Sequence, residues 1–213
     1  IANIYALPHP SFSVRFKDFQ ATTKAVSFAT DSDFLEPFIH DGNLNALIIV
    51  GSPDPHGPEK ARSKDGYYGM DLALFLGTFL NYIPGLSVRL DTEVHETDLK
   101  NNLIIIGGPI VNSISAKINE KLPIRFTEKS ILSTLSDKEY FTDETGIIVK
   151  TQNPFDKTKK ILLIAGRRYA GTRACTIAFL KHFKELASGN THNQKIHAKV
   201  IEGVDLDSAG IVD

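Results

Sequence analysis

The chain contains a single cysteine and no excess of basic over acidic residues. The first excludes a scaffold held by internal disulfides, and the second argues against a nucleic-acid-binding protein. Cys175 cannot form a disulfide within the chain, and it lies in an apolar run with helical spacing, so we predict a small buried side chain. The 24 basic and 25 acidic residues do not give the excess of positive charge typical of nucleic-acid binding, so we expect no direct nucleic-acid contact. No apolar run approaches the roughly 18 residues that a membrane-spanning helix requires, so we expect no membrane partner.

The length of 213 residues suits a single α/β domain spanning 1–213. Neither an Asn-x-Ser/Thr acceptor for N-glycosylation nor a signal-peptide pattern is present, which favours a cytoplasmic location over the alternative, the cell surface. Because the chain begins at Ile1 rather than at a methionine, we expect it to be a fragment with a further domain N-terminal to Ile1. The acidic stretch 205–213 looks like a degenerate calcium loop, but Ala209 occupies the position of the third ligand, so we predict a solvated turn.

Three apolar runs are each followed by a glycine turn and then by a helical pattern, and this repetition predicts the fold. The runs are 46–50, 103–106 and 161–165. We therefore predict an α/β fold with a mostly parallel, Rossmann-like sheet and helices on both faces. Short strands between residues 124 and 151 predict a small antiparallel patch. The helices are expected at 31–39, 67–83, 110–122 and 172–187, and further strands at 43–50, 87–94 and 196–201, with an additional strand and a short amphipathic segment within 11–28.

In a parallel sheet such turns gather at the carboxyl ends of the strands, where ligands usually bind. The candidate ligand-binding residues are Gly51, Ser52, Asp54 and His56 in the first turn, Gly107, Gly108 and Asn112 in the second, and Gly166, Arg167, Arg168, Gly171 and Thr172 in the third. Arginines beside a helix start form a reasonable site for an anionic small molecule. The alternative for the third turn is a helix N-cap by Thr172 with solvated arginines. For Asn112 we favour hydrogen bonds that hold the edge of the sheet.

The first turn also allows a metal-site hypothesis. Asp54 and His56 resemble the first metal-ligand pair of the calcineurin-like phosphoesterases, and further candidate ligands follow them at Asp65, Asp71, Asp91, Glu93 and His95. The later motifs of that family, Gly-Asp-x-x-Asp-Arg-Gly and Gly-Asn-His, are missing. We therefore assign no metal, no cofactor and no catalytic residue, and keep a metal-dependent hydrolase of a phosphorylated or nucleotide-like substrate as the alternative function.

Three segments taken together resemble the archaeal S-layer protein family. The segments are 101–112, which ends in Gly-Gly-Pro-Ile-Val-Asn, 162–174, in which Ala-Gly is followed by Gly-Thr at the start of a helical pattern, and 203–207. The resemblance implies an α/β domain that binds or assembles, without catalytic residues to carry over. We accordingly predict a non-catalytic module that senses a ligand or mediates assembly, and expect it to form a homo-oligomer. It would serve as the effector domain of an intracellular regulator or, alternatively, as an extracellular S-layer domain.

Overall fold

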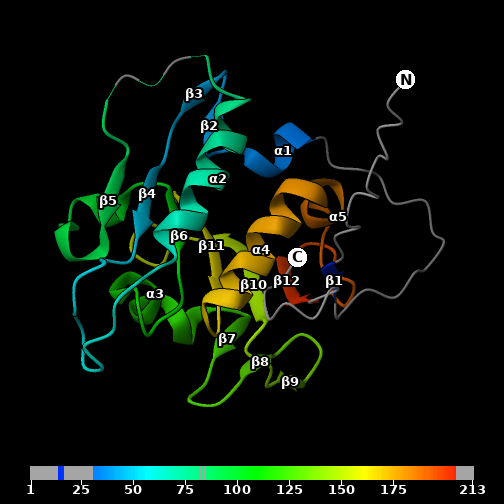
Figure 1. The fold of residues 1–213 in the computed structure, drawn as a ribbon. Helices are drawn as coiled ribbons and strands as arrows, with labels where there is room; N and C mark the ends of the chain where they lie inside the picture. The colour runs from blue at the N-terminus through cyan, green and yellow to red at the C-terminus, as the bar shows by residue number, and fades with distance from the viewer. Residues whose placement is uncertain (1–13, 17–30, 82, 84, 205–213) are drawn as a thin grey trace, which may run out of the picture.

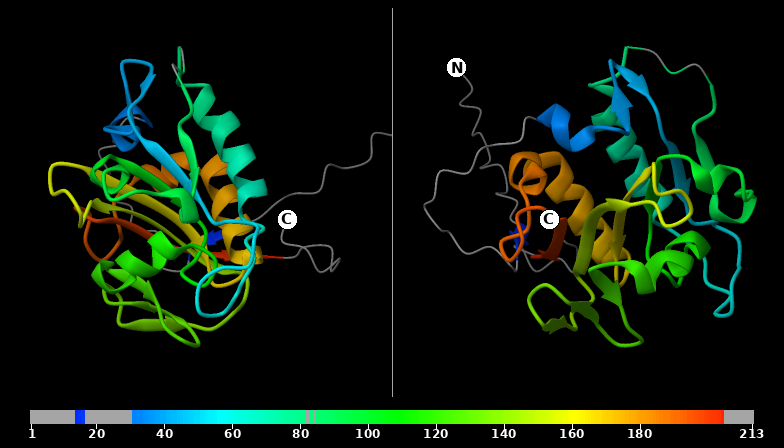
Figure 2. Two further views of the ribbon diagram at one scale, coloured as in Figure 1. Left: turned by 90° about the vertical axis from the view of Figure 1, so that its left-hand side faces the viewer. Right: turned by 180° about the vertical axis from the view of Figure 1, so that it is seen from behind.

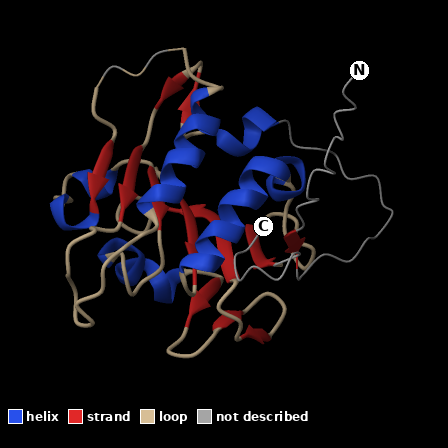
Figure 3. Ribbon diagram, in the orientation of Figure 1, coloured by secondary structure: helices blue, strands red, loops and turns tan. Residues whose placement is uncertain are grey.

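One mixed sheet contains strands from both ends of the described chain. The computed structural model describes residues 14–16, 31–81, 83 and 85–204. The sheet has seven strands in the order β1-β12-β10-β11-β6-β4-β5 (Figures 1 and 3). Their bounds are β1 Val14–Phe16, β4 Leu47–Val50, β5 Val88–Leu90, β6 Leu103–Ile106, β10 Thr145–Gln152, β11 Lys160–Gly166 and β12 His197–Gly203. The predicted α/β class is confirmed.

The mostly parallel, Rossmann-like arrangement is not confirmed, because only half of the sheet is parallel. Strands β5, β4, β6 and β11 pair in parallel, whereas β11 with β10, β10 with β12 and β12 with β1 pair antiparallel. The physical reason is the short connection 153–159 between β10 and β11, since a tight turn can join only antiparallel strands. The sequence predicts this turn at Asn153-Pro154, but does not give the direction of the strand that precedes it.

Helices cover one face of the sheet, and a short helix with a small second sheet covers the other (Figure 2, left). The first face carries α1 (Asp31–Leu35), α2 (Gly66–Gly77), α4 (Tyr169–Lys181) and α5 (Phe183–Ala187). The second carries α3 (Ser113–Ile118) and the antiparallel strands β7 (Ile124–Phe126), β8 (Ile131–Ser133) and β9 (Lys138–Tyr140). The described residues also form three 3-10 turns, at Asp91–Glu93, Asp98–Lys100 and Asn119–Lys121.

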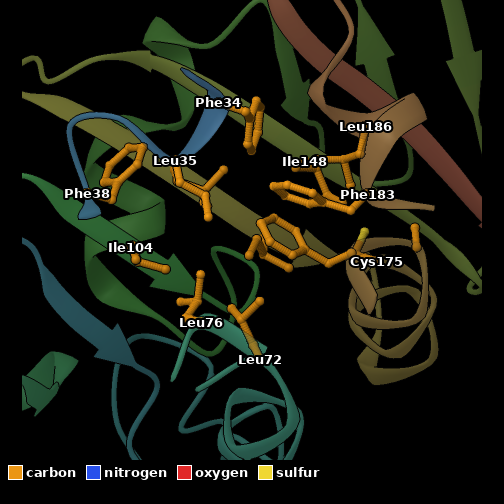
Figure 4. Close-up of a cluster of buried hydrophobic side chains, with 14 of the residues drawn as sticks. Phe34, Leu35, Phe38, Leu72, Leu76, Ile104, Ile148, Cys175, Phe183 and Leu186 are labelled. Atoms are coloured by element: carbon orange, nitrogen blue, oxygen red, sulfur yellow. The ribbon is translucent and has the colours of Figure 1, made fainter. Parts of the chain in front are cut away.

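The core under the helices is built around aromatic rings that pack in tilted or edge-to-face contacts. Phe34, Phe179 and Phe183 come from three different helices, and their ring centroids lie 5.2–6.2 Å apart. Figure 4 shows this cluster between α1, α2 and the neighbouring strands. Cys175 lies within it and is fully buried, as predicted, and burial raises the pKa of its thiol well above the usual range. Cys175 is therefore a packing residue.

A hairpin interrupts the region that the sequence assigns to one helix and one strand. The helix expected over 31–39 ends at Leu35, and β2 (Ile39–His40) then pairs antiparallel with β3 (Asn43–Leu44). Asp41 and Gly42, at φ 48° and 72°, form the turn. Asp-Gly is a preferred pair for such two-residue turns. This signal was missed, and the strand expected over 43–50 is in fact divided into β3 and β4.

Several helix ends also differ from expectation because particular side chains set them. The helix predicted at 110–122 begins only after Asn112, whose side-chain oxygen accepts hydrogen bonds from Ile114 N and Ser115 N. The helix predicted at 172–187 begins at Tyr169 and breaks at His182, which has a non-helical backbone. The prediction that Thr172 caps this helix is wrong, since Arg168 is the N-cap residue. The predicted acidic turn at 205–213 and most of 11–28 lie outside the described residues.

Candidate functional site

The three predicted glycine turns converge at the carboxyl ends of β4, β6 and β11. Gly51 packs against the backbone carbonyl of Val111, in the turn after β6, so a side chain at this position would collide with it. Gly108 approaches the carbonyl of Gly166, in the turn after β11, and a Cβ at Gly108 would lie only 2.6 Å from that oxygen. The three turns therefore form one continuous surface.

A cavity of about 260 Å³ opens between the turns after β6 and β11. The chain leaves β6 toward α3 on one face of the sheet and leaves β11 toward α4 on the other face (Figure 1). Loops that diverge in this way leave a crevice at the strand ends, the usual place for a ligand in α/β sheets. The cavity is lined by Arg62, Lys64, Asp65, Gly108, Pro109, Ile110, Val111, Phe126, Thr127, Glu128, Gly166, Arg167, Arg168 and Tyr169.

Asp65 is the buried charged residue of this cavity. It immediately precedes α2, is only 4 % exposed, and its Oδ1 has no hydrogen-bond partner within the described part of the chain. Burial raises the pKa of Asp65 to about 6, against the opposing effect of a hydrogen bond with the Thr172 side chain. Gly107 makes room for this carboxylate, because its φ of 106° is unfavourable for other residues and a Cβ there would lie 2.9 Å from Asp65 Oδ2.

The predicted arginines differ in how freely they can reach a ligand. Arg167 Nη1 donates to the Phe141 carbonyl at 2.6 Å and pairs with Asp143 at 2.5 Å, so it holds the 141–143 segment. Arg168 is more exposed, and its Nε lies 3.9 Å from Asp143 Oδ1. The N-terminus of α4 behind them receives no side-chain cap. Its backbone N–H groups and the positive end of the helix dipole therefore face the cavity rim.

Asp91 connects the first and second turns, a role the sequence analysis missed. Its buried carboxylate accepts hydrogen bonds from Ser52 N and Ser113 N, both at 2.7 Å. The Nε2 of His56 lies 3.1 Å from the same carboxylate, and its Nδ1 lies 2.8 Å from the Asp54 carbonyl. The position of Asp91 directly after a strand was the available signal. His56 thus fastens its own loop and does not reach over the cavity.

The metal-site hypothesis receives no support from this arrangement. The His56 ring is engaged by Asp91 and by the Asp54 backbone, while the Asp54 side chain is exposed to solvent. Across the residues that the structure describes, no group of three or more His, Cys, Asp or Glu side chains is placed to hold a metal ion.

Three further predicted residues serve the scaffold. Asn112 is fully buried, caps α3, and donates from Nδ2 to the Ile106 carbonyl at 3.0 Å, which fits the favoured structural role. The Thr172 hydroxyl accepts a hydrogen bond from Gly166 N at 2.9 Å and so fixes the turn after β11. Gly171 packs against the Thr145 backbone. Of the twelve predicted residues, only Gly108, Gly166, Arg167 and Arg168 line the cavity.

A second surface is apolar and lies on the outer side of α2. Tyr67, Met70 and Leu74 occupy one stripe of the helix and are 71 %, 63 % and 74 % exposed. Between this stripe and strand β5 runs a groove of about 400 Å³, which reaches Val88 on the edge of the sheet. We call Tyr67, Met70, Leu74 and Val88 the α2–β5 face. The sequence could have indicated this face, because α2 carries a single charged residue, Asp71.

The second and third turns, together with the strands that carry them, coincide with a recognised family segment. Residues 83–183 match the model of the S-layer like family, outer domain. The resemblance predicted from the sequence is thereby confirmed over this S-layer-like segment, which runs from just before β5 into α5. The first turn, Asp65 and most of the α2–β5 face precede it.

One relative matches part of the chain without adding a function. Over 88 residues the chain is 28 % identical to the uncharacterized protein MJ0954 of Methanocaldococcus jannaschii. The match covers 41 % of this chain but only 18 % of that protein's length. Neither match assigns an enzymatic or regulatory role. Within the described ranges, no helix has the length and apolar character needed to cross a membrane.

Proposed function

We propose that this protein is a structural module of an S-layer-like protein that pairs with a second copy of itself through the α2–β5 face. The observation that carries the proposal is the exposed apolar stripe of Tyr67, Met70 and Leu74 beside the edge strand β5. The S-layer-like segment at 83–183 supports a role at the cell surface, where repeated contacts between subunits build a layer.

The α2 helix is apolar on two sides, and only one side is used within the chain. Leu72 and Leu76 are buried in the core, whereas Met70 and Leu74 point to the opposite side and are exposed. A helix that is apolar all round normally lies inside a protein or an assembly. Contiguous apolar patches on a soluble surface usually mark an interface.

A second copy is the partner that best fits the chemistry of this face. The three residues of the stripe are uncharged, and Asp71 beside them is the single charge on α2, so the face offers little that would require a complementary charge on a different protein. Two such stripes can pack against each other around a two-fold axis, since the same patch then serves both subunits. Edge strand β5 lies beside the stripe, so the same contact also shields the Val88 side chain.

The expected dimer is weak. Complete burial of one such side chain contributes about 1.5–3 kcal/mol, and these four are between half and three-quarters exposed. A two-fold dimer buries four of them from each copy, which contributes roughly 8–16 kcal/mol, and the loss of translational and rotational freedom on association, on the order of 4–15 kcal/mol, offsets most of this gain. Such a dimer is seen at high protein concentration and strengthens when many copies are held in one layer.

Sedimentation velocity over a wide concentration range tests the proposal. We expect the wild-type chain to shift from monomer to dimer as concentration rises, and the double variant Met70→Glu, Leu74→Glu to stay monomeric. Leu180→Glu on α4 is the matched control, because Leu180 is an exposed leucine outside the face. A wild type that remains monomeric throughout, or a control that dissociates as fully as the double variant, contradicts the proposal.

A further inference from the structure

The cavity between β6 and β11 contains a buried acceptor that the protein itself does not satisfy. Asp65 Oδ1 has no hydrogen-bond partner among the described residues, although the residue is 4 % exposed. Buried polar atoms in folded proteins nearly always have a partner, so an exception needs an explanation. Burial also raises the pKa of this carboxylate to about 6, a perturbation typical of functional sites. Because Asp65 lines the cavity, its carboxylate is the acceptor available there to a ligand hydroxyl.

The rim of the cavity is rich in basic side chains, in contrast to the Asp65 carboxylate. Arg62, Lys64 and Arg168 line it with exposed side chains, and the uncapped N-terminus of α4 lies beside them. Glu128 is the acidic residue on the opposite wall. Helix N-termini and arginines favour phosphate and carboxylate groups. The rim therefore favours an anionic group, while the interior favours a hydrogen-bond donor.

The size and walls of the cavity limit the ligand further. Its volume of about 260 Å³ equals that of about nine water molecules, enough for a molecule of monosaccharide size. Pro109, Ile110, Val111 and Phe126 give most of the wall an apolar character, and Tyr169 stands at the rim. Apolar walls with a few convergent polar groups suit a carbon skeleton better than a bare inorganic ion.

We propose that this cavity binds a small hydroxylated organic anion, such as a sugar monophosphate or a hydroxy acid. A ligand hydroxyl donates to the Asp65 carboxylate, and the anionic group lies at the rim formed by Arg62, Lys64, Arg168 and the start of α4. Tyr67, Met70 and Val88 of the α2–β5 face line the other groove, and of the proposed ligand-binding residues only Lys64 also borders that groove. We therefore expect substitutions in the stripe to leave ligand binding unchanged.

Thermal unfolding with a panel of compounds is the first experiment. The panel contains glucose 6-phosphate, ribose 5-phosphate, glycerol 3-phosphate, lactate and malate. Glucose, which has hydroxyl groups but no anionic group, and inorganic phosphate, which has no carbon skeleton, are the controls. We expect at least one hydroxylated anion to raise the Tm of the wild type in a saturable manner, since a ligand that binds only the folded state stabilises it. Glucose and inorganic phosphate should bind at least tenfold more weakly than that compound.

Variants then connect the binding to the proposed atoms. Calorimetric titration of the best compound should show a Kd that Asp65→Asn weakens about 10- to 100-fold, the range expected for a hydrogen bond to a charged group. Asp71→Asn, an exposed aspartate on the adjoining helix, is the matched control and should leave the Kd unchanged. The double variant Arg62→Ala, Lys64→Ala changes only exposed side chains and should weaken binding several-fold without affecting folding.

Three outcomes would overturn the proposal. No panel compound raises the Tm; inorganic phosphate binds as tightly as the best hydroxylated anion; or Asp65→Asn, folded as judged by circular dichroism, keeps the wild-type affinity. The pairing variant Met70→Glu, Leu74→Glu should retain the ligand Kd.

Discussion

Replacing Asp65 by asparagine should make the protein more stable at neutral pH. Asn has nearly the same shape as Asp but cannot carry the charge that burial disfavours. Because burial raises the pKa of Asp65 in the folded state to about 6, from an ordinary value of 3.8, the folded state binds the proton more tightly than the unfolded state does. The stability that this proton contributes is fully present below about pH 3.8 and is lost as the pH rises through 6.

The magnitude follows from this difference in pKa. A shift of one pKa unit corresponds to 1.36 kcal/mol, so a shift of roughly two units makes the charged Asp65 cost about 3 kcal/mol above pH 7. The Asn side chain adds an N–H group that needs an acceptor, which lowers the expected gain to about 1–3 kcal/mol. Near pH 4 the gain should be lost, and Asp65→Asn should be no more stable than the wild type.

Urea denaturation between pH 4 and 8 measures the effect as the difference between Asp65→Asn and wild type. Taking the difference removes the titration of the other carboxylates that both proteins share. Asp71→Asn, which changes an exposed aspartate of α2, serves again as the control. A difference that stays flat for Asp65→Asn, or a variant that is less stable than wild type at pH 7.5, would refute the reasoning from burial.

Three further substitutions test the scaffold around the site. Asp91→Ala leaves the N–H groups of Ser52 and Ser113 without their acceptor, and should cost about 3 kcal/mol of unfolding free energy in urea denaturation. Gly107→Ala places a Cβ against Asp65 at φ 106°, and should lower the Tm by several degrees, corresponding to about 2 kcal/mol. Lys150→Met removes hydrogen bonds of 2.7 and 2.6 Å from its Nζ to the Phe34 and Glu36 carbonyls at the end of α1. It should cost about 2 kcal/mol, with proteolysis increased first at α1. Equal stability of any of these variants and the wild type would contradict the corresponding role.

The parallel strands were predictable because their sequences are apolar throughout. The runs at β4, β6 and β11 have neighbours on both faces, so no polar alternation is needed. The same property hides strand direction, since β10 is just as apolar over Ile147–Val149 yet runs antiparallel to β11. Direction depends on which strands become neighbours, and composition does not record that.

The candidate site, too, was predictable only where the local sequence determines the structure. The glycine turns after β6 and β11 were predictable, because backbone requirements at a strand end are local. The burial of Asp65 was not, since it results from the approach of Gly107 from a turn some forty residues later in the chain. Likewise, the sequence shows Arg167 as an available cation, whereas the folded chain commits it to Asp143.

The sheet order also defines how much chain is needed to make this domain. The S-layer-like segment begins at residue 83, yet β4, at Leu47–Val50, lies between two of its strands, β5 and β6. At the other side of the sheet, β12 lies beyond the segment and pairs with β10. A polypeptide of residues 83–183 alone would leave β5 with no neighbour and expose one edge of both β6 and β10. The unit that folds, and that evolution can move between proteins, is therefore larger than the unit that sequence comparison detects.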